Sequence, residues 1–445
     1  MLQSRFAEAL ALDERSAVAT EEERAVALYR LGCYRSVTAL DVKARSAPAS
    51  VAVAASLAAC GKADDAEMVI HGAQAQGLLP GRFLHSAVRA LAPFQVGLAA
   101  ELASDLPGAP GLRAAVFAAA GRADEARSVV AHALWRRPTP RDRDLLLLAA
   151  NFATEPAERA RLLNAHLVAH GLAPVRTHPE PAAPSPMTAA STLPAGTVTG
   201  PLVSVIMPAY NVEGRIGAAI ASLLAQTYRD LEILVVDDAS TDATAAAAER
   251  AAAGDPRVRV LRLERNGGPY VARNRALTEA RGDFVTCHDG DDWAHPERIA
   301  RQVAPLRRFH WLVCTTSNWV RVTDDGTFYA RPVYPVCRLN PASPLVRREP
   351  VIARIGGWDP VRTGADSEFL ARLKLAYGPF RWKRVPKTLT LGAHRPGSLM
   401  TDPHTGMGIG TVNSDRLAYW ESWSARHRRM LRAAGVRRFA LAAPP

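Results

Sequence analysis

Residues Phe284–Ile299 read FVTCHDGDDWAHPERI, an apolar run that passes directly into three aspartates within four positions, Asp289, Asp291 and Asp292. Clustered carboxylates repel one another and resist removal from water, so a buried strand that ends in them needs a reason. Two ordinary reasons are a solvated turn and a set of helix caps. A third is that a cation arrives there together with a ligand.

Residues 201–415 alternate short apolar segments with helical ones. The apolar segments include LVSVIMPAY, LEILVVDDAS, RVRVLRLE and DFVTCHDGDD. This order predicts an α/β domain with a mostly parallel sheet covered by helices on both faces. Ligands of such sheets bind beyond the carboxyl ends of the strands. Asp237–Asp238 and Asp289–Asp292 both follow predicted strands, so we expect the two acidic clusters to face one crevice.

Residues 1–170 are rich in alanine and leucine at helical spacing, and they repeat. The turn residues are Gly32, Gly61, Pro93, Gly121 and Asn151, which gives a period near 30 residues. The pattern predicts an all-α domain of stacked helical hairpins, of a tetratricopeptide-like kind, that binds a protein partner. An irregular all-helical bundle is the alternative.

Two further segments lie outside these domains. Residues 171–200 are dominated by proline, alanine, serine and threonine without periodicity, which predicts an extended flexible linker. Residues 416–445 form a basic, aromatic tail with Tyr419, Trp420 and Trp423, predicted to be helical. We expect its aromatics to pack on the 201–415 domain; the alternative is contact with an anionic membrane surface.

The composition of the 445-residue chain, with 48% hydrophobic and 22% charged residues, is that of globular protein. No apolar run approaches the roughly 20 residues that cross a bilayer, and no signal-peptide core is visible at the start. Five scattered cysteines without a CxxC pair fit a reducing compartment. We therefore expect a cytoplasmic protein. The net charge of +12 favours anionic partners, but no nucleic-acid reading motif occurs, so we expect no nucleic-acid partner.

The common nucleotide-binding motifs are missing from the sequence. No G-x-G-x-x-G follows the first predicted strand, and neither a G-x-x-x-x-G-K-[ST] loop nor H-E-x-x-H occurs. What remains is a phosphate-bearing ligand held by carboxylates through a divalent cation. Hard oxygen ligands select Mg²⁺ or Mn²⁺.

Four strings, in this order and spacing, resemble the family 2 glycosyltransferases of GT-A fold. They are VSVIMPAYNVE, VVDDASTD, GGPYVARNRAL and GDFVTCHDGDDWAHPERI. The resemblance covers residues 202–306 and continues more loosely to about residue 424. It implies an inverting, metal-dependent enzyme that moves a sugar from a nucleotide diphosphate, with a UDP-sugar favoured, to an acceptor hydroxyl. A cell-surface polysaccharide product, a glycan or lipid-linked acceptor, and peripheral contact with the inner face of the membrane fit the same resemblance.

The resemblance implies a set of residues that bind the nucleotide sugar. Asp238 would accept a hydrogen bond from the base, and the backbone of Pro208, Ala209 and Tyr210 would form the floor of its pocket. Arg273 would reach the diphosphate, since a guanidinium suits bidentate phosphate contact. A structural tie between helix and sheet is the equal alternative for Arg273.

The resemblance also implies metal ligands. Asp291 would bind the cation, Asp289 would contact the metal or the ribose, and His394 would be a third ligand. A divalent ion neutralises the charge that builds on a leaving diphosphate. Asp292 is expected to cap the following turn or support the site, and packing is the alternative role for His394.

Asp366 is the candidate general base that removes the proton of the attacking hydroxyl. It matches the aspartate of the family's Glu-Asp motif, whereas Ala365 replaces the glutamate. Glu368 is therefore considered as a residue that shares the task. Ordinary roles for the two carboxylates are an N-cap and an exposed side chain.

Two other functions stay open on the sequence alone. One is a nucleotidyltransferase, although its Gly-rich basic loop after the first strand is missing. The other is an inert interaction protein that uses its helical hairpins. The intact Asp238, Asp289, Asp291 and Asp366 argue against the latter.

Overall fold

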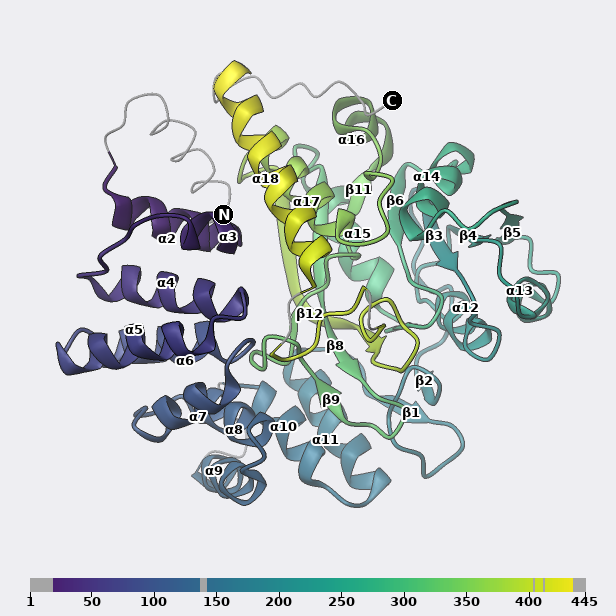
Figure 1. Ribbon diagram of the computed structural model, residues 1–445. Helices are drawn as coiled ribbons and strands as arrows, with labels where there is room; N and C mark the ends of the chain where they lie inside the picture. The colour runs from purple at the N-terminus through teal and green to yellow at the C-terminus, as the bar shows by residue number, and fades with distance from the viewer. Residues whose placement is uncertain (1–18, 137–141, 403–404, 411–412, 435–445) are drawn as a thin grey trace. The chain divides into compact units, whose positions relative to one another are not determined.

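The computed structural model describes residues 19–136, 142–402, 405–410 and 413–434 (Figure 1). The chain divides into two compact units. The helical unit comprises the described residues within 19–149, 330–336 and 396–434, and the sheet unit comprises residues 150–329 and 337–395. A helical region over residues 21–169 thus precedes an α/β sheet in the chain, which confirms the predicted fold class.

The helical unit consists of successive antiparallel helix pairs (Figure 1). Its helices are α2 (Glu21–Leu31), α3 (Tyr34–Thr38), α4 (Ala47–Ala59), α5 (Ala63–Ala75), α6 (Arg82–Leu91), α7 (Val96–Ser104), α8 (Pro110–Ala119) and α9 (Ala123–Arg136). The predicted turn residues Gly32, Gly61, Pro93 and Gly121 each lie between the two helices of a pair. Asn151 instead lies within α10 (Asp144–Phe152). The small, buried alanines of α4 allow neighbouring helices to approach closely.

Two of these turns share one backbone geometry. Gly32 and Gly61 have φ values of 78° and 81°, in the left-handed region that glycine adopts without strain. The Gly32 N–H donates to the Tyr29 carbonyl at 2.9 Å, and the Gly61 N–H donates to the Ala58 carbonyl at 3.1 Å. Both glycines therefore terminate a helix by satisfying its last carbonyl groups.

The long C-terminal helix α18 (Ser414–Ala434) packs on the first hairpin of the helical unit. The Trp420 indole N–H donates to the Leu31 carbonyl at 2.5 Å, and the Cys33 thiol contacts the Ser424 hydroxyl at 3.4 Å. Trp423 is buried as well. The prediction that the tail aromatics pack on the 201–415 domain is wrong for Trp420, because its indole takes its polar partner from the Leu31 carbonyl at the end of α2. Residues 435–445 of the predicted tail lie outside the described residues.

The sheet unit holds a mixed sheet with strand order β5-β4-β3-β6-β11-β8-β12-β7, to which β9 and β10 are added beside β8. The strands are β3 (Val203–Ala209), β4 (Leu231–Asp237), β5 (Val258–Arg262), β6 (Phe284–Cys287), β7 (Trp293–Ala294), β8 (Cys314–Val322), β9 (Phe328–Tyr329), β10 (Arg338–Leu339), β11 (Leu345–Arg347) and β12 (Trp382–Ala393). The run β5-β4-β3-β6 is parallel, as predicted. Beyond it, β11 is antiparallel to both neighbours, so the sheet is mixed.

Helices connect the strands of the sheet unit. They are α11 (Pro156–Ala169), α12 (Ile216–Leu224), α13 (Thr244–Ala252), α14 (Pro269–Glu279), α15 (Arg298–Arg308), α16 (Arg348–Ile355) and α17 (Ala365–Tyr377). Every residue of β3 and β4 is buried, which explains why both strands are continuous apolar runs. Val205 of β3, Ile233 of β4 and Ile220 of α12 are fully buried members of one hydrophobic core.

The segment 171–200 differs from the extended linker predicted from its composition. It carries an antiparallel strand pair, β1 (Val175–Thr177) and β2 (Ala189–Ser191). The Asn164 side chain on α11 pairs with both backbone polar groups of Val175, each at 2.8 Å. The Ala173 N–H donates to Glu297 at 2.9 Å. Side-chain partners thus order a stretch that has no hydrophobic period of its own, and the sheet unit begins at Ala150.

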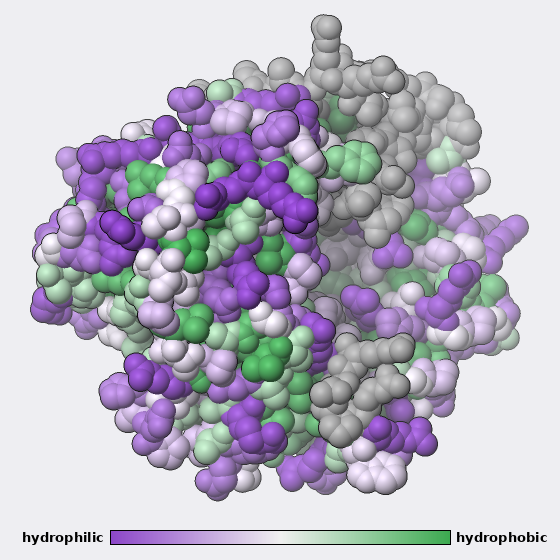
Figure 2. All heavy atoms as spheres, turned by 180° about the vertical axis from the view of Figure 1, so that it is seen from behind, coloured by the Kyte–Doolittle hydropathy of each residue, from purple (hydrophilic) through white to green (hydrophobic). Residues whose placement is uncertain are grey.

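No described helix is both long and apolar enough to span a bilayer. The face shown in Figure 2 mixes hydrophilic and hydrophobic residues over its coloured surface. Peripheral membrane contact stays a prediction.

The docking of α18 predicts different costs for two glycine substitutions. A Cβ atom at Gly32 would lie 2.8 Å from the Trp420 indole nitrogen, whereas a Cβ atom at Gly61 meets no described atom within 4 Å. Both Gly→Ala changes force a left-handed alanine, which costs about 1–2 kcal/mol. We expect Gly32→Ala to lower the free energy of unfolding in urea by about 1 kcal/mol more than Gly61→Ala.

A double-mutant cycle checks the cause of that difference. In a Trp420→Ala background, the extra cost of Gly32→Ala over Gly61→Ala should disappear. An equal extra cost with and without Trp420 would contradict the docking of α18 on this turn.

Candidate active site

The carboxyl ends of β3, β4 and β6 bring the first group of predicted residues together. The Asp238 N–H donates to the Ala209 carbonyl at 2.9 Å, and the His288 N–H donates to the Ile206 carbonyl at 2.9 Å. A Cβ atom at Gly290 would lie 3.2 Å from the Pro208 carbonyl oxygen, so the acidic loop passes directly against the end of β3. The two acidic clusters therefore follow strands whose ends are neighbours in the sheet, as expected.

The loop after β3 is fixed to the loop after β4. Asn211 has a φ of 49°, a left-handed conformation that asparagine tolerates. Its side-chain oxygen accepts from the Thr241 N–H at 2.9 Å, and its own N–H donates to the Ser240 hydroxyl at 3.1 Å. Tyr210 precedes it and stays 45% exposed, whereas Ala209 is buried. An exposed aromatic on a fixed backbone suits stacking against a flat ligand.

Asp238 is buried, and both of its oxygens have backbone partners. They accept from the Gly267 and Gly268 N–H groups at 2.8 and 2.7 Å. Gly268 has a φ of 88° and is followed by the first residue of α14, Pro269. Asp238 therefore orders the turn that starts α14, and its predicted contact with a base stays a prediction.

Arg273 on α14 links the candidate metal loop to the candidate base. Its side chain is 2% exposed and donates to Asp289 at 2.7 Å and also to Asp366. The Tyr270 hydroxyl donates to the second oxygen of Asp366 at 2.9 Å. The guanidinium lies 5.1 Å from the centre of the Tyr270 ring. The structural tie considered for Arg273 is thus present, and it joins α14, the acidic loop and α17.

Burial and charge act against each other in this group. Burial opposes the charge on Arg273, but the facing carboxylates, Asp366 first, raise its pKa well above the ordinary value. Burial likewise opposes the charge on Asp289, yet the Arg273 guanidinium lowers the pKa of that carboxyl. Burial and the Asp366 charge raise the pKa of Tyr270, which keeps it a phenol that donates its proton. The site therefore holds an ionised arginine between two aspartates.

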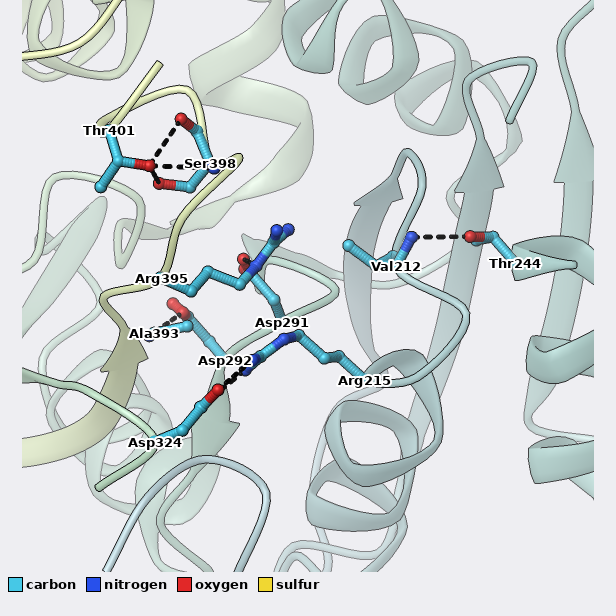
Figure 3. A network of polar contacts seen from close by, with 10 residues as sticks. All are labelled: Val212, Arg215, Thr244, Asp291, Asp292, Asp324, Ala393, Arg395, Ser398 and Thr401. Atoms are coloured by element: carbon cyan, nitrogen blue, oxygen red, sulfur yellow. Dashed lines mark hydrogen bonds and ion pairs between the residues drawn. The ribbon is translucent and has the colours of Figure 1, made fainter. Parts of the chain in front are cut away.

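Asp291 and Asp292 are held by the end of β12 (Figure 3). Arg395 donates to Asp291 at 2.9 Å, and the Ala393 N–H donates to Asp292 at 2.9 Å. Burial, followed by the charges of Asp291 and Asp289, raises the pKa of Asp292 well above its ordinary value. Asp292 therefore fastens the acidic loop to β12, in line with its expected supporting role, while Asp291 faces a cationic side chain.

A buried pair below the acidic loop was not identified from the sequence. Arg298 is fully buried and donates to His288 Nδ1 at 2.9 Å and to the Cys287 carbonyl at 2.6 Å. Burial, then the Arg298 charge, lowers the pKa of His288 to about 3. A neutral His288 that accepts at Nδ1 donates from Nε2 to the Asp292 carbonyl, 3.1 Å away. Arg298 lies in the opening stretch, but nothing local in FVTCHDGDDWAHPERI signals that its side chain turns inward.

His394 lies in the chain between the two residues that hold Asp292 and Asp291. Its ring stacks on Tyr329, with centroids 3.9 Å apart and an interplanar angle of 8°. Burial lowers the pKa of His394, which favours the neutral imidazole that metals bind. Within the described residues, its buried Nδ1 has no hydrogen-bond partner.

The predicted ligand set fits a hard divalent cation in its chemistry. Carboxylate oxygens from Asp289 and Asp291 suit Mg²⁺ or Mn²⁺, which often bind through one or two carboxylates and substrate phosphates. In the structure, Asp289, Asp291 and His394 do not form a close group of ligand atoms. In the described parts of the chain, three ligand-type side chains lie within 4.8 Å of one another only at His166, His170 and Cys337.

Glu368 points into the protein instead of sharing the site of Asp366. It is fully buried and pairs with Arg372 at 2.7 Å. Arg372 also donates to the Gly357 carbonyl at 2.8 Å. Both ends of this ion pair are thus committed to joining α17 to the preceding loop. The structure therefore gives no support to Glu368 as a shared base and leaves Asp366 as the candidate.

A pocket of about 670 Å³ opens beyond the ends of β3 and β4. Residues that line it include Asn211, Glu213, Arg215, Asp242, Asp324 and Arg395. Figure 3 shows the Arg215 side chain directed to its ion-pair partner Asp324 and the Arg395 side chain beside Asp291. Two arginines at one pocket suit an anionic ligand.

Residues 204–349 match the family described as Glycosyl transferase family 2. These residues form a family 2 glycosyltransferase domain. An uncharacterized glycosyltransferase of Haemophilus influenzae is 36% identical to the chain over 126 residues, which are 28% of the chain and 50% of that protein. The succinoglycan biosynthesis protein ExoO of Rhizobium meliloti is 45% identical over 103 residues, 23% of the chain and 29% of that protein.

The putative teichuronic acid biosynthesis glycosyltransferase TuaG of Bacillus subtilis is 40% identical to the chain over 103 residues, 23% of the chain and 41% of that protein. Among solved structures, S. aureus TarS 1–349 in complex with UDP-GlcNAc aligns with a TM-score of 0.38 and 25% identity, over 44% of the chain and 59% of that structure. The chain spans half or less of the length of these curated relatives.

The pairing of Glu368 predicts a cost in stability. Glu368→Ala leaves the buried Arg372 without its carboxylate, so the free energy of unfolding should fall by about 3–5 kcal/mol. The matched control Glu349→Ala, at an exposed glutamate in the first turn of α16, should cost less than ~1 kcal/mol. Denaturant unfolding of the full chain measures both.

A different result would return Glu368 to the catalytic candidates. If Glu368→Ala kept wild-type stability but abolished sugar transfer, the structural role of the ion pair would be contradicted.

Proposed function

We propose that the protein is a metal-dependent inverting glycosyltransferase that moves a sugar from a nucleotide diphosphate to an acceptor hydroxyl. One observation carries this proposal above the others. Within a family 2 domain, the buried Arg273 holds a candidate metal-loop carboxylate, Asp289, and a candidate base, Asp366, on two sides of one guanidinium. This arrangement supports a site in which the nucleotide sugar and its acceptor lie next to each other.

The nucleotide sugar binds beyond the ends of β3 and β4 in this proposal. Tyr210 is exposed on a fixed loop and stacks on the base, and Pro208 and Ala209 form the floor beneath it. Arg215 and Arg395 contribute positive charge to the adjoining pocket for the diphosphate. Each of these arginines exchanges an aspartate partner for phosphate oxygens, a ligand of the same charge type.

Asp289 and Asp291 would hold the divalent cation, with His394 as a further ligand. When bound, a Mg²⁺ or Mn²⁺ ion neutralises the negative charge that collects on the departing nucleotide diphosphate. Arg395 neutralises Asp291 in the absence of the ion, so the loop is never left with three unbalanced carboxylates. His394 is suited by its neutral ring and its unpartnered Nδ1 among the described atoms.

Asp366 removes the proton of the acceptor hydroxyl in this proposal. The contacts from Arg273 and Tyr270 fix the orientation of its carboxylate. Each oxygen has a second lone pair that an acceptor hydroxyl can use. Direct displacement by that hydroxyl inverts the configuration at the anomeric carbon.

We place the reaction in cell-surface polysaccharide synthesis. Two relatives of the family 2 domain are named for succinoglycan and for teichuronic acid biosynthesis, which supports this setting. A UDP-sugar and a glycan or lipid-linked acceptor remain the substrates predicted from the sequence. Release of nucleotide diphosphate from a panel of nucleotide sugars, with Mn²⁺ or Mg²⁺, tests the reaction class.

Neutralisation of two neighbouring aspartates should have unequal effects on activity. Asp291→Asn removes a metal-binding charge, so nucleotide diphosphate release should fall at least ~100-fold. Asp292→Asn retains an oxygen that accepts from the Ala393 N–H and relieves repulsion from Asp291, so release should stay within ~3-fold of wild type. Comparable activity in the two variants would contradict the assignment of Asp291.

Asp366→Asn separates binding from transfer. The variant retains an oxygen for Arg273 but loses the base, so transfer should fall about 10²–10⁴-fold. Affinity for the nucleotide sugar, measured by calorimetry, should change less than ~3-fold. A matching loss of affinity, or transfer within ~10-fold of wild type, would contradict the role of Asp366.

A further inference from the structure

A second group of metal-ligating side chains lies in the sheet unit, with two histidines that precede the family 2 match and one cysteine within it. His166 and His170 are four residues apart at the end of α11, so both project from one face of the helix. Their ring centroids are 4.6 Å apart. Cys337, which directly precedes β10, joins them, and one ligand atom of each residue lies within 4.8 Å of the others.

One hydroxyl group connects the first histidine to the cysteine. His166 is fully buried, and its Nε2 lies 2.8 Å from the Thr388 hydroxyl. The Cys337 sulfur lies 3.1 Å from the same hydroxyl, and the Asn318 side-chain amide donates to this sulfur at 3.5 Å. Thr388 stands where the register of β12 with β8 is interrupted. An irregular strand therefore presents a polar group at the point where an imidazole and a thiol meet.

We propose that His166, His170 and Cys337 bind a Zn²⁺ ion, with water in the fourth coordination position. Two imidazoles and a thiolate form a borderline-soft ligand set that selects Zn²⁺ over Mg²⁺ and Mn²⁺. Zn–N and Zn–S bonds of about 2.0–2.3 Å place tetrahedral ligands roughly 3.5 Å apart. The three side chains therefore need to close by about an ångström, which rotation of the side chains supplies.

The ion would connect elements that are distant in the sequence. It joins the end of α11 to the start of β10, beside the irregular part of β12. Cys337 transfers its thiol proton to solvent when it becomes a ligand. The zinc site shares no residue with the proposed Mg²⁺ or Mn²⁺ site, whose ligands are Asp289, Asp291 and His394. It therefore stands independently of the proposed sugar transfer, and excess Mg²⁺ should leave it loaded.

Metal binding to the full chain tests the proposal directly. Protein stripped with a chelator and held in excess Mg²⁺ should take up about one Zn²⁺ per chain, and Co²⁺ in its place should give a thiolate charge-transfer band and the visible bands of a tetrahedral site. Chelation should lower the midpoint of thermal unfolding by about 5–10 °C.

Two variants, each with a matched control, locate the ligands. Cys337→Ser and His170→Gln should each weaken Zn²⁺ binding at least ~100-fold, and Cys337→Ser should abolish the charge-transfer band. Cys60→Ser and His132→Gln remove the same chemical groups from the helical unit and should bind as wild type does.

Two results would overturn the zinc site. One is wild-type protein whose Co²⁺ spectrum lacks the thiolate band, a result that needs no variant to fold. The other is Zn²⁺ binding by Cys337→Ser and His170→Gln with wild-type affinity. Sugar transfer, measured separately, distinguishes the two proposals, because a loaded zinc site without transferase activity contradicts only the function proposed above.

Discussion

The buried guanidinium of Arg273 is the interaction on which the candidate active site depends. Arg273 lies on α14, Asp289 follows β6 and Asp366 begins α17, so one side chain joins three elements that are distant in the sequence. A buried cation is strongly unfavourable unless its partners are close and well oriented. The requirement to neutralise Arg273 therefore fixes where both aspartates lie. The positive charge of Arg273 also offsets the repulsion between the carboxylates of Asp289 and Asp366.

The acidic loop is balanced from a second side. Arg395 neutralises Asp291, and the backbone at Ala393 holds Asp292. Beneath the loop, Arg298 and the neutral His288 contribute hydrogen bonds without adding another carboxylate. The clustered aspartates Asp289, Asp291 and Asp292 are thus tolerated because each one meets a different partner. Those partners come from α14 and from the end of β12.

The sequence predicted the sheet region and the neighbourhood of its aspartates because both follow from local rules. Hydrophobic runs with turn residues define strands, and parallel strands place their carboxyl ends at one edge. The helical hairpins were predictable for the same reason, since Gly32 and Gly61 recur at the period of the repeat. Residue-by-residue resemblance supplied Asp366, which no local pattern distinguishes from a helix cap.

The features that escaped prediction depend on long-range partners. The β1–β2 pair is ordered by Asn164, and α18 finds its partner at the end of α2, at the opposite end of the chain. The sequence left Glu368 open as a catalytic carboxylate, but in the fold it pairs with Arg372. In each case the deciding contact is a hydrogen bond or ion pair between side chains and groups whose proximity only the fold creates.

A crystal structure of the full chain with a nucleoside diphosphate and Mn²⁺ tests the central claim most directly. The account predicts the diphosphate beside Asp289 and Asp291, with Arg395 moved from Asp291 to the phosphates and with Asp366 still paired to Arg273. A diphosphate bound away from Asp289 and Asp291, or an Arg273 that has released Asp366, would contradict it.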